Sequence, residues 1–99
     1  MQACVYIMAS LSGRLYTGVT SDLMRRVHQH RTDACPGFTR RHRVHRLVYY
    51  ECARDMHVAI AREKQNKAWS RHKRITLIES FNPAWLDLTA DWYATESAE

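Results

Sequence analysis

The sequence predicts an α+β domain in which a small three-stranded antiparallel sheet is flanked by helices, in the order ββαβαα. Segments rich in β-branched and aromatic residues predict the strands, at 4–8, 14–20 and 47–53. Longer stretches that follow capping residues predict the helices. The length of 99 residues, with 45% apolar and 25% charged residues, is typical of a single globular domain.

The first two strands are expected to form a hairpin around a loop at 9–13. This loop places Tyr6 directly opposite Tyr16, and Cys4 opposite Gly18. Side chains alternate between the faces of a sheet, so the two tyrosines and the glycine share one face. The two phenols would converge beside a glycine, where a ligand could approach. A cross-strand aromatic pair that only stabilises the sheet gives the same pattern.

The first helix is expected over 22–31, after a serine–aspartate cap. At about 100° per residue, Leu23 and Val27 share one helix face with Arg26 and His30. A helix that only packs on a sheet would turn apolar side chains toward it. The arginine and the histidine on this face therefore call for a functional reason.

Two further helices are expected over 55–71, capped by Asp55, and over 72–80, ending before Pro83. Glu63 lies on an apolar row of the first of them. A carboxylate in such a place is costly unless it is paired or bound to a metal ion. Glu63 is therefore either a metal ligand or the partner of an arginine in a salt bridge.

Charge is distributed unevenly along the chain. All fifteen Lys and Arg lie within 1–74 with five of the ten acids, whereas 75–99 carries the other five acids and no base. A body this basic attracts polyanions, of which nucleic acid is the commonest. No stretch approaches the roughly 18 apolar residues of a membrane span. The N-terminus has no basic leader before its apolar run, so a cytoplasmic location is expected.

The three cysteines are odd in number and widely spaced, unlike those of a small secreted domain. A zinc site from Cys35, His42, His45 and Cys52 is an alternative, but the chain lacks the closely spaced cysteine pair that structural zinc sites usually use. Free, partly buried thiols are the better interpretation.

The segments "CVY" at 4–6 and "YTG" at 16–18 resemble the paired signature of the GIY-YIG nuclease superfamily. The stretches "TSDLMRRVHQH", "LVYYE", "AREKQNKAW" and "NPAW" resemble its small, stand-alone bacterial members, and the resemblance covers about residues 3–88. It implies a GIY-YIG-like nuclease domain over 1–88, followed by an acidic C-terminal tail over 89–99.

Three positions depart from the family's signature. Cys4 replaces its first glycine, Val5 its isoleucine, and Thr17 the isoleucine of the second triplet. These changes are conservative for strand packing and keep both tyrosines. Many family nucleases also carry a separate DNA-recognition domain, which is not seen here, so no sequence specificity is implied.

The resemblance implies six site residues: Tyr6, Tyr16, Arg26, His30, Glu63 and Asn82. Tyr6 would deprotonate the attacking water or relay its proton, and Tyr16 would orient water or phosphate. Arg26 would grip the phosphate with two hydrogen bonds, and His30 would bond a phosphate or pass protons. Glu63 would hold one Mg²⁺ or Mn²⁺ ion, whose other ligands are water and phosphate oxygen.

We therefore expect a metal-dependent endonuclease acting on DNA, with branched or damaged DNA as candidate substrates. The alternative is a module that binds nucleic acid and cleaves it poorly or not at all. Glu63 favours the enzyme, because a pure binder gains nothing from a buried acid among phosphates. Asn82 supports the site in the family but fits a helix C-cap before Pro83 equally well. The residues expected to contact nucleic acid are Gly18, Arg25, Arg40, Arg41, Arg43, Arg46, Arg62, Lys64 and Lys67.

Overall fold

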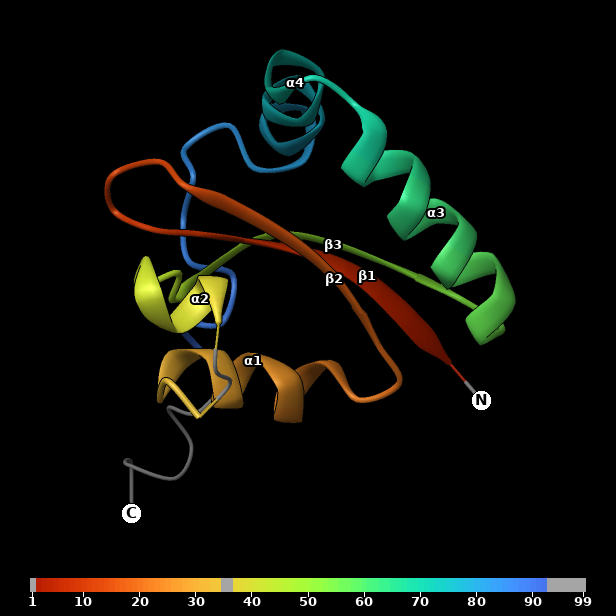
Figure 1. Ribbon diagram of the computed structural model, residues 1–99, viewed down its shortest axis with the longest axis horizontal. Coiled ribbons are helices and arrows are strands. Elements are labelled where there is room, and N and C mark those ends of the chain that lie inside the picture. The colour runs from red at the N-terminus through yellow and green to blue at the C-terminus, as the bar shows by residue number, and fades with distance from the viewer. Residues whose placement is uncertain (1, 35–36, 93–99) are drawn as a thin grey trace.

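The computed structural model describes residues 2–34 and 37–92. Its three strands are β1 (Ala3–Ala9), β2 (Leu15–Thr20) and β3 (Arg46–Ala53), which form an antiparallel sheet in the order β2-β1-β3 (Figure 1). Its helices are α1 (Leu23–Arg31), α2 (Phe38–Arg41), α3 (Met56–Ala68) and α4 (Arg71–Phe81). The predicted fold class is confirmed, with the single-turn α2 added in a segment expected to be a loop.

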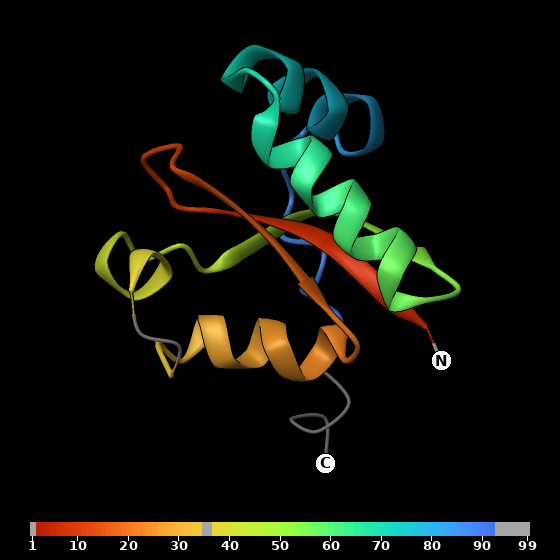
Figure 2. The ribbon, with the colours of Figure 1, turned by 45° about the vertical axis from the view of Figure 1, so that its right-hand side comes forward.

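The sheet separates two layers of helices. α1 and α2 lie on one side, and α3 and α4 on the other (Figure 2). On the α1 side, Val27 packs against Tyr6 and Met8 of the central strand. On the opposite side, Ala59 of α3 packs against Ala3 and Val5, in a second buried cluster. A third cluster joins the side chains beneath α4, namely Ile7, Ala9, Leu15, Val48, Tyr49 and Ile78.

Side-chain caps set where the helices begin. Asp22 accepts a hydrogen bond from the backbone of Arg25, and Asp55 accepts one from Val58, as the sequence indicated. The two helices expected over 55–71 and 72–80 are α3 and α4, and only the boundary between them differs: α3 ends at Ala68, and α4 begins at Arg71. Trp69 is extended, with ψ 155°, and the hydroxyl of Ser70 caps α4 by accepting from the Lys73 backbone.

The hairpin register differs from the predicted one by two residues. Ala9 pairs with Leu15, so that Tyr6 lies opposite Gly18 and not opposite Tyr16. The reason is the turn: the Ser10 amide donates to the Arg14 carbonyl, and the Ser10 hydroxyl accepts from the Arg14 amide. A shift of two residues keeps each side chain on its face, so the shared face of the tyrosines is retained.

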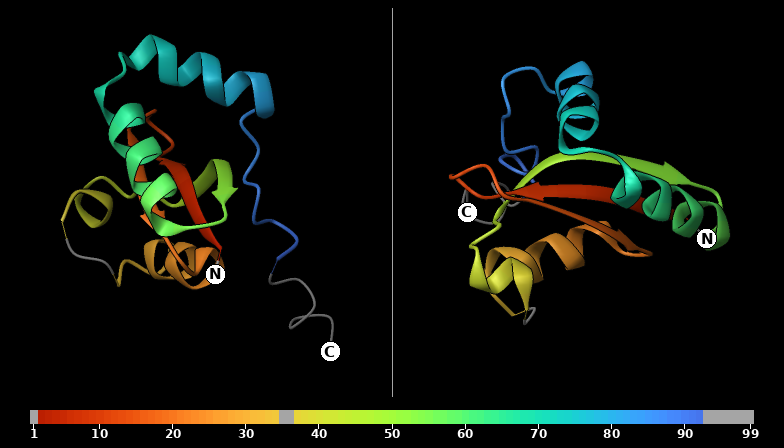
Figure 3. Two further views of the ribbon diagram at one scale, coloured as in Figure 1. Left: turned by 90° about the vertical axis from the view of Figure 1, so that its right-hand side faces the viewer. Right: turned by 45° about the horizontal axis from the view of Figure 1, so that its top comes forward.

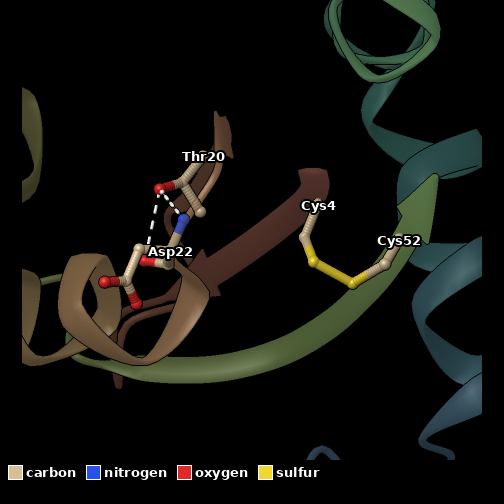
Figure 4. The surroundings of a disulfide bond; sticks show 4 residues. All are labelled: Cys4, Thr20, Asp22 and Cys52. Atoms are coloured by element: carbon tan, nitrogen blue, oxygen red, sulfur yellow. Dashed lines mark hydrogen bonds between the residues drawn. A yellow bond between two sulfur atoms is a disulfide. The ribbon is translucent and has the colours of Figure 1, made fainter. Parts of the chain in front are cut away.

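Two of the cysteines form a disulfide, so the expectation of free thiols is wrong for Cys4 and Cys52 (Figure 4). They face each other because β1 and β3 pair in a register that sets Cys4 opposite Cys52. Closing a loop of 48 residues typically stabilises a fold by about 2–4 kcal/mol. Cys35 lies outside the described residues.

The alternative zinc site also finds no support where the structure describes the chain. His45 pairs with Asp33, with 2.7 Å between Nε2 and Oδ1. Across 2–34 and 37–92, no group of three or more His, Cys, Asp or Glu side chains is arranged to hold a metal ion.

After α4 the chain crosses back to the side of the sheet that carries α1 (Figure 3). The Leu88 amide donates to the Leu47 carbonyl at 2.8 Å, and Thr89 is fully buried and accepts a hydrogen bond from Arg31. Trp92 packs against the buried cluster that contains Tyr6, Met8 and Val27. Packed structure therefore continues to Trp92. None of the helices within the described ranges is long and apolar enough to cross a membrane.

Candidate active site

The hairpin and α1 bring two tyrosines and a histidine together on the α1 side of the sheet. The Tyr6 hydroxyl and His30 Nε2 are 2.9 Å apart, within hydrogen-bonding distance. The Tyr16 ring centroid lies 6.3 Å from that of Tyr6 and 5.3 Å from that of His30. Tyr6 is 1% exposed and His30 is 2% exposed, whereas Tyr16 is half-buried. Three of the six predicted site residues thus form one cluster.

Gly18 makes room for the ring of Tyr6 in this cluster. A Cβ placed on Gly18 would lie 2.5 Å from Cζ of Tyr6, much closer than van der Waals contact allows. Gly18 is itself buried, and the Tyr6 ring covers it. The glycine therefore allows Tyr6 to lie flat over β2 and reach His30.

His30 is the middle of a buried three-residue chain. Its Nδ1 lies 3.2 Å from the hydroxyl of Thr39, on α2, while its Nε2 faces Tyr6. Burial, and secondarily the positive charge of Arg26, lower the pKa of His30 from 6.5 to about 4. His30 is therefore neutral near pH 7. Thr39 carried no signal in the sequence, because it falls in a segment that lacked helical periodicity.

α2 also adds an aromatic contact to the cluster. The ring of Phe38 stacks on that of Tyr16, with 6.4 Å between the centroids and 25° between the planes. Phe38 remains 40% exposed. The short helix thus supplies both a buried hydroxyl to His30 and an apolar wall to Tyr16.

Arg26 lies one turn before His30 on α1 and is exposed. It is not buried against the sheet, as the helix face had suggested, but stands at the rim, where its charge still acts on His30. Together with neighbouring side chains it borders a polar pocket of about 270 Å³, lined by Thr20, Ser21, Asp22, Arg25, Arg26 and Gln29. An exposed guanidinium at such a pocket can bind an oxyanion.

Glu63 lies on α3, which covers the other face of the sheet. α3 packs on β1 and on the edge strand β2. The Glu63 side chain is 16% exposed, and Lys67 lies one turn later with its Nζ 3.4 Å from Glu63 Oε2. The same ammonium group lies 5.9 Å from the Tyr16 ring centroid. Lys67 therefore lies near both Glu63 and Tyr16, and the partner of Glu63 is a lysine where the sequence suggested an arginine.

A divalent ion fits this arrangement through one protein ligand. The Glu63 carboxylate offers hard oxygen donors, and it is mostly buried beside the site. Mg²⁺ usually retains several waters and binds through one or two carboxylates together with substrate phosphates. Glu63 alone thus suits an ion that is completed by water and substrate.

Asn82 is not brought to this cluster. It ends α4, and its side-chain amide donates to the carbonyls of Val48 and Leu86 and accepts from the Leu86 amide. All of these partners are backbone groups beneath or just after α4. The arrangement is the helix cap that the sequence allowed.

The predicted nucleic-acid contacts divide into two groups. Arg46 and Arg62 make contacts within the fold. Arg46 donates to the Ser10 carbonyl at 3.0 Å. Arg62 pairs with Glu51, and its guanidinium carbon lies 4.9 Å from the Trp69 ring centroid. The remaining side chains are exposed, namely Arg25, Arg40, Arg41, Arg43, Lys64 and Lys67.

A family model described as the GIY-YIG catalytic domain matches residues 2–76. This chain belongs to the GIY-YIG family. The resemblance read from its two tyrosine triplets is thereby confirmed. GIY-YIG is a nuclease superfamily whose members generally use divalent metal ions.

Similar proteins carry the name UPF0213, a small stand-alone family of the GIY-YIG type. A UPF0213 protein from Haloquadratum walsbyi is 36% identical over 75 residues, or 76% of this chain and 84% of the relative. One from Desulfotalea psychrophila is 38% identical over 77 residues, or 77% of this chain and 70% of the relative. The solution NMR structure of a Bacillus halodurans UPF0213 protein, 27% identical, superposes with a TM-score of 0.58 over 92% of this chain and 98% of that one.

Proposed function

We propose that this GIY-YIG protein is a metal-dependent endonuclease that hydrolyses phosphodiester bonds in DNA, branched or damaged DNA included. The observation that carries the proposal is the buried hydrogen bond between Tyr6 and a neutral His30, next to the half-buried Tyr16. A pair of tyrosines that served only the sheet would not require a histidine buried beside them. A phenol held by a neutral imidazole is an arrangement suited to proton transfer.

In the proposed reaction, Tyr6 acts as a phenolate that has first lost its own proton to solvent. A water molecule attacks phosphorus while its proton passes to the phenolate oxygen of Tyr6. The bond from phosphorus to the leaving oxygen breaks, and that oxygen takes a proton from solvent. Tyr6 is 1% exposed, so Tyr16 is the ring that meets and orients the phosphate. Arg26, exposed at the rim, binds the non-bridging oxygens as negative charge builds on them.

Glu63 would hold one Mg²⁺ or Mn²⁺ ion. When bound, such an ion stabilises the developing charge and the leaving oxygen as a Lewis acid. The exposed basic residues of α1, α2 and α3 would bind the phosphates on either side. Asn82 supports the site only indirectly, by fastening the end of α4 to β3.

The substitution Glu63→Gln separates an enzyme from a pure binder, because the amide keeps the shape and loses the charge. Cleavage of a panel of single-stranded, duplex, nicked and branched DNA with Mg²⁺ or Mn²⁺ should fall by several orders of magnitude. DNA affinity should hold or improve, since a negative charge near phosphates is gone. The melting temperature should change little, because a partly exposed ion pair with Lys67 contributes about 0–1 kcal/mol.

Asp91→Asn is the matched control, because this carboxylate is exposed. It should change none of the three quantities. Unchanged cleavage in Glu63→Gln would rule out the metal assignment. A wild-type protein that binds the whole panel and cleaves none of it would favour the binding module instead.

A further inference from the structure

Of the thirteen residues of α3, only Ala59 and Asn66 are buried. Ala59, near the start of the helix, packs on Ala3 and Val5 of β1. Asn66, in the last turn, is 0% exposed, and a polar side chain is costly to bury. The way in which α3 lies on the sheet therefore depends on one alanine and one asparagine.

A hydrogen bond joins Asn66 to the sheet. The Thr17 hydroxyl, on β2, donates to Asn66 Oδ1 at 2.8 Å, and Thr17 is 2% exposed. Apolar contacts are non-directional, so the packing of Ala59 does not by itself fix how α3 is rotated. A hydrogen bond depends on both distance and angle. The bond between Thr17 and Asn66 therefore fixes the last turn of α3 against β2.

Both partners in this bond are neighbours of residues at the candidate active site. Thr17 directly follows Tyr16 on β2. Asn66 directly precedes Lys67, and it lies three residues after Glu63. The Lys67 Nζ is 3.4 Å from Glu63 Oε2 and 5.9 Å from the Tyr16 ring centroid. A movement of α3 along β2 therefore displaces Lys67 and its partner Glu63 relative to Tyr16.

Stability alone does not account for an asparagine at this position. Within the described part of the chain, no group accepts a hydrogen bond from the buried Nδ2 of Asn66. A buried donor without a partner typically costs at least as much as one neutral hydrogen bond contributes. A leucine would fill the same space without that cost. The geometry that the asparagine imposes is the better explanation for it.

We infer that Asn66 is a positioning residue: its bond to Thr17 sets α3 against β2, so that Lys67, together with its partner Glu63, lies beside Tyr16. The effect on catalysis rests on the proposed function. Asn66 acts through these side chains and does not touch the substrate. A displacement of about 1 Å in a catalytic group can slow a reaction about a hundredfold. A movement of a fraction of that distance should lower kcat about tenfold.

A paired substitution separates position from stability. Thr17→Val combined with Asn66→Leu replaces the bond by two apolar side chains of similar shape, so the melting temperature should equal or exceed that of the wild type. Thr17→Ser keeps the hydroxyl and removes a buried methyl group, so it should lower the melting temperature by about 4–8 °C. A paired variant that melts well below the wild type, or does not fold, would make the bond a structural one and refute the inference.

Nuclear Overhauser contacts between the Lys67 side chain and the Tyr16 ring measure the geometry without any activity measurement. They should be present in the wild type and in Thr17→Ser, and weakened in the paired variant. Contacts that are missing from the wild type, or that persist unchanged in the paired variant, would overturn the positioning role.

Cleavage should follow the contacts and not the melting temperature. In the paired variant, kcat should fall about tenfold with KM within about twofold, whereas the less stable Thr17→Ser should keep both within about twofold. An unchanged kcat in the paired variant would refute the role of Asn66 in catalysis. A wild-type protein that shows the contacts and cleaves none of the DNA panel would refute the proposed function and leave the placement of α3 by Asn66 standing.

Discussion

Gly18→Ala tests whether this glycine accommodates Tyr6 or a ligand. The added methyl would lie 2.5 Å from Cζ and 2.9 Å from Cε1 of Tyr6. Gly18 does not have a positive φ, unlike Gly13 and Gly37, so alanine would suit its backbone. The whole effect of the substitution therefore comes from the collision with the ring.

The magnitude follows from how tightly Tyr6 is enclosed. The ring is 1% exposed and packs against Val27 and Met8, so it cannot move aside without displacing neighbours. Overpacking of this kind costs about 1–3 kcal/mol. Any movement also stretches the bond to His30, which adds about 1 kcal/mol. We expect a total loss of about 2–4 kcal/mol in the free energy of unfolding.

Denaturant unfolding of Gly18→Ala alone and in a Tyr6→Ala background measures this coupling. In the second background the space is empty, so the cost should fall below about 1 kcal/mol. Gly37→Ala is the control: it has φ 96°, and among the described residues nothing beyond its chain neighbours lies within 4 Å of the added methyl. Its backbone cost of about 1–3 kcal/mol should therefore be the same in both backgrounds. Unchanged stability in Gly18→Ala, with weakened nucleic-acid binding, would refute the argument and restore a ligand role.

Two further predictions concern charged groups at the site. Lys67→Met should raise the affinity for Mn²⁺ about two- to fivefold in titration calorimetry without nucleic acid, because the ammonium that competes for Glu63 is gone. Lys64→Met removes a charge from the same helix without removing the ion pair to Glu63, so it should leave the affinity for Mn²⁺ unchanged. Equal effects of both variants would show that the overall charge, and not competition for Glu63, sets the affinity. The lowered pKa of His30 predicts constant stability above about pH 6.5 and a loss on the order of 3 kcal/mol as the pH falls to about 4, because the unfolded chain alone binds the proton. Urea unfolding across this range measures the loss, and a curve equally steep in His30→Gln would contradict it.

Short-range patterns predicted the shared face of Tyr6 and Tyr16 and the helix face of His30, whereas their grouping into one site came from the family resemblance. The faces of the strands depend only on whether residue numbers are odd or even, so the error in the hairpin register did not separate the tyrosines. Exact pairing depended on the hydroxyl of Ser10 inside the turn, which composition does not reveal. The end of α3 at Ala68 was missed, although Ser70 is a typical cap of the helix that follows.

Other features arise only from contacts between distant segments. The disulfide requires the register of β1 against β3, which is interrupted by an irregularity between Ile7 and Met8. Thr39 becomes significant only when α2 docks beside α1. Arg26 shares the helix side of His30 in a wheel projection, yet Arg26 is exposed while His30 is buried. Local periodicity cannot supply any of these three results.

The disulfide between Cys4 and Cys52 makes a covalent ring of the first half of the chain. Tyr6, Tyr16 and His30 lie inside this ring, and Glu63 lies outside it. A protease that cuts one peptide bond within the ring opens it without separating the pieces. The disulfide keeps the two resulting peptides joined, so electrophoresis separates them only when a reductant is present.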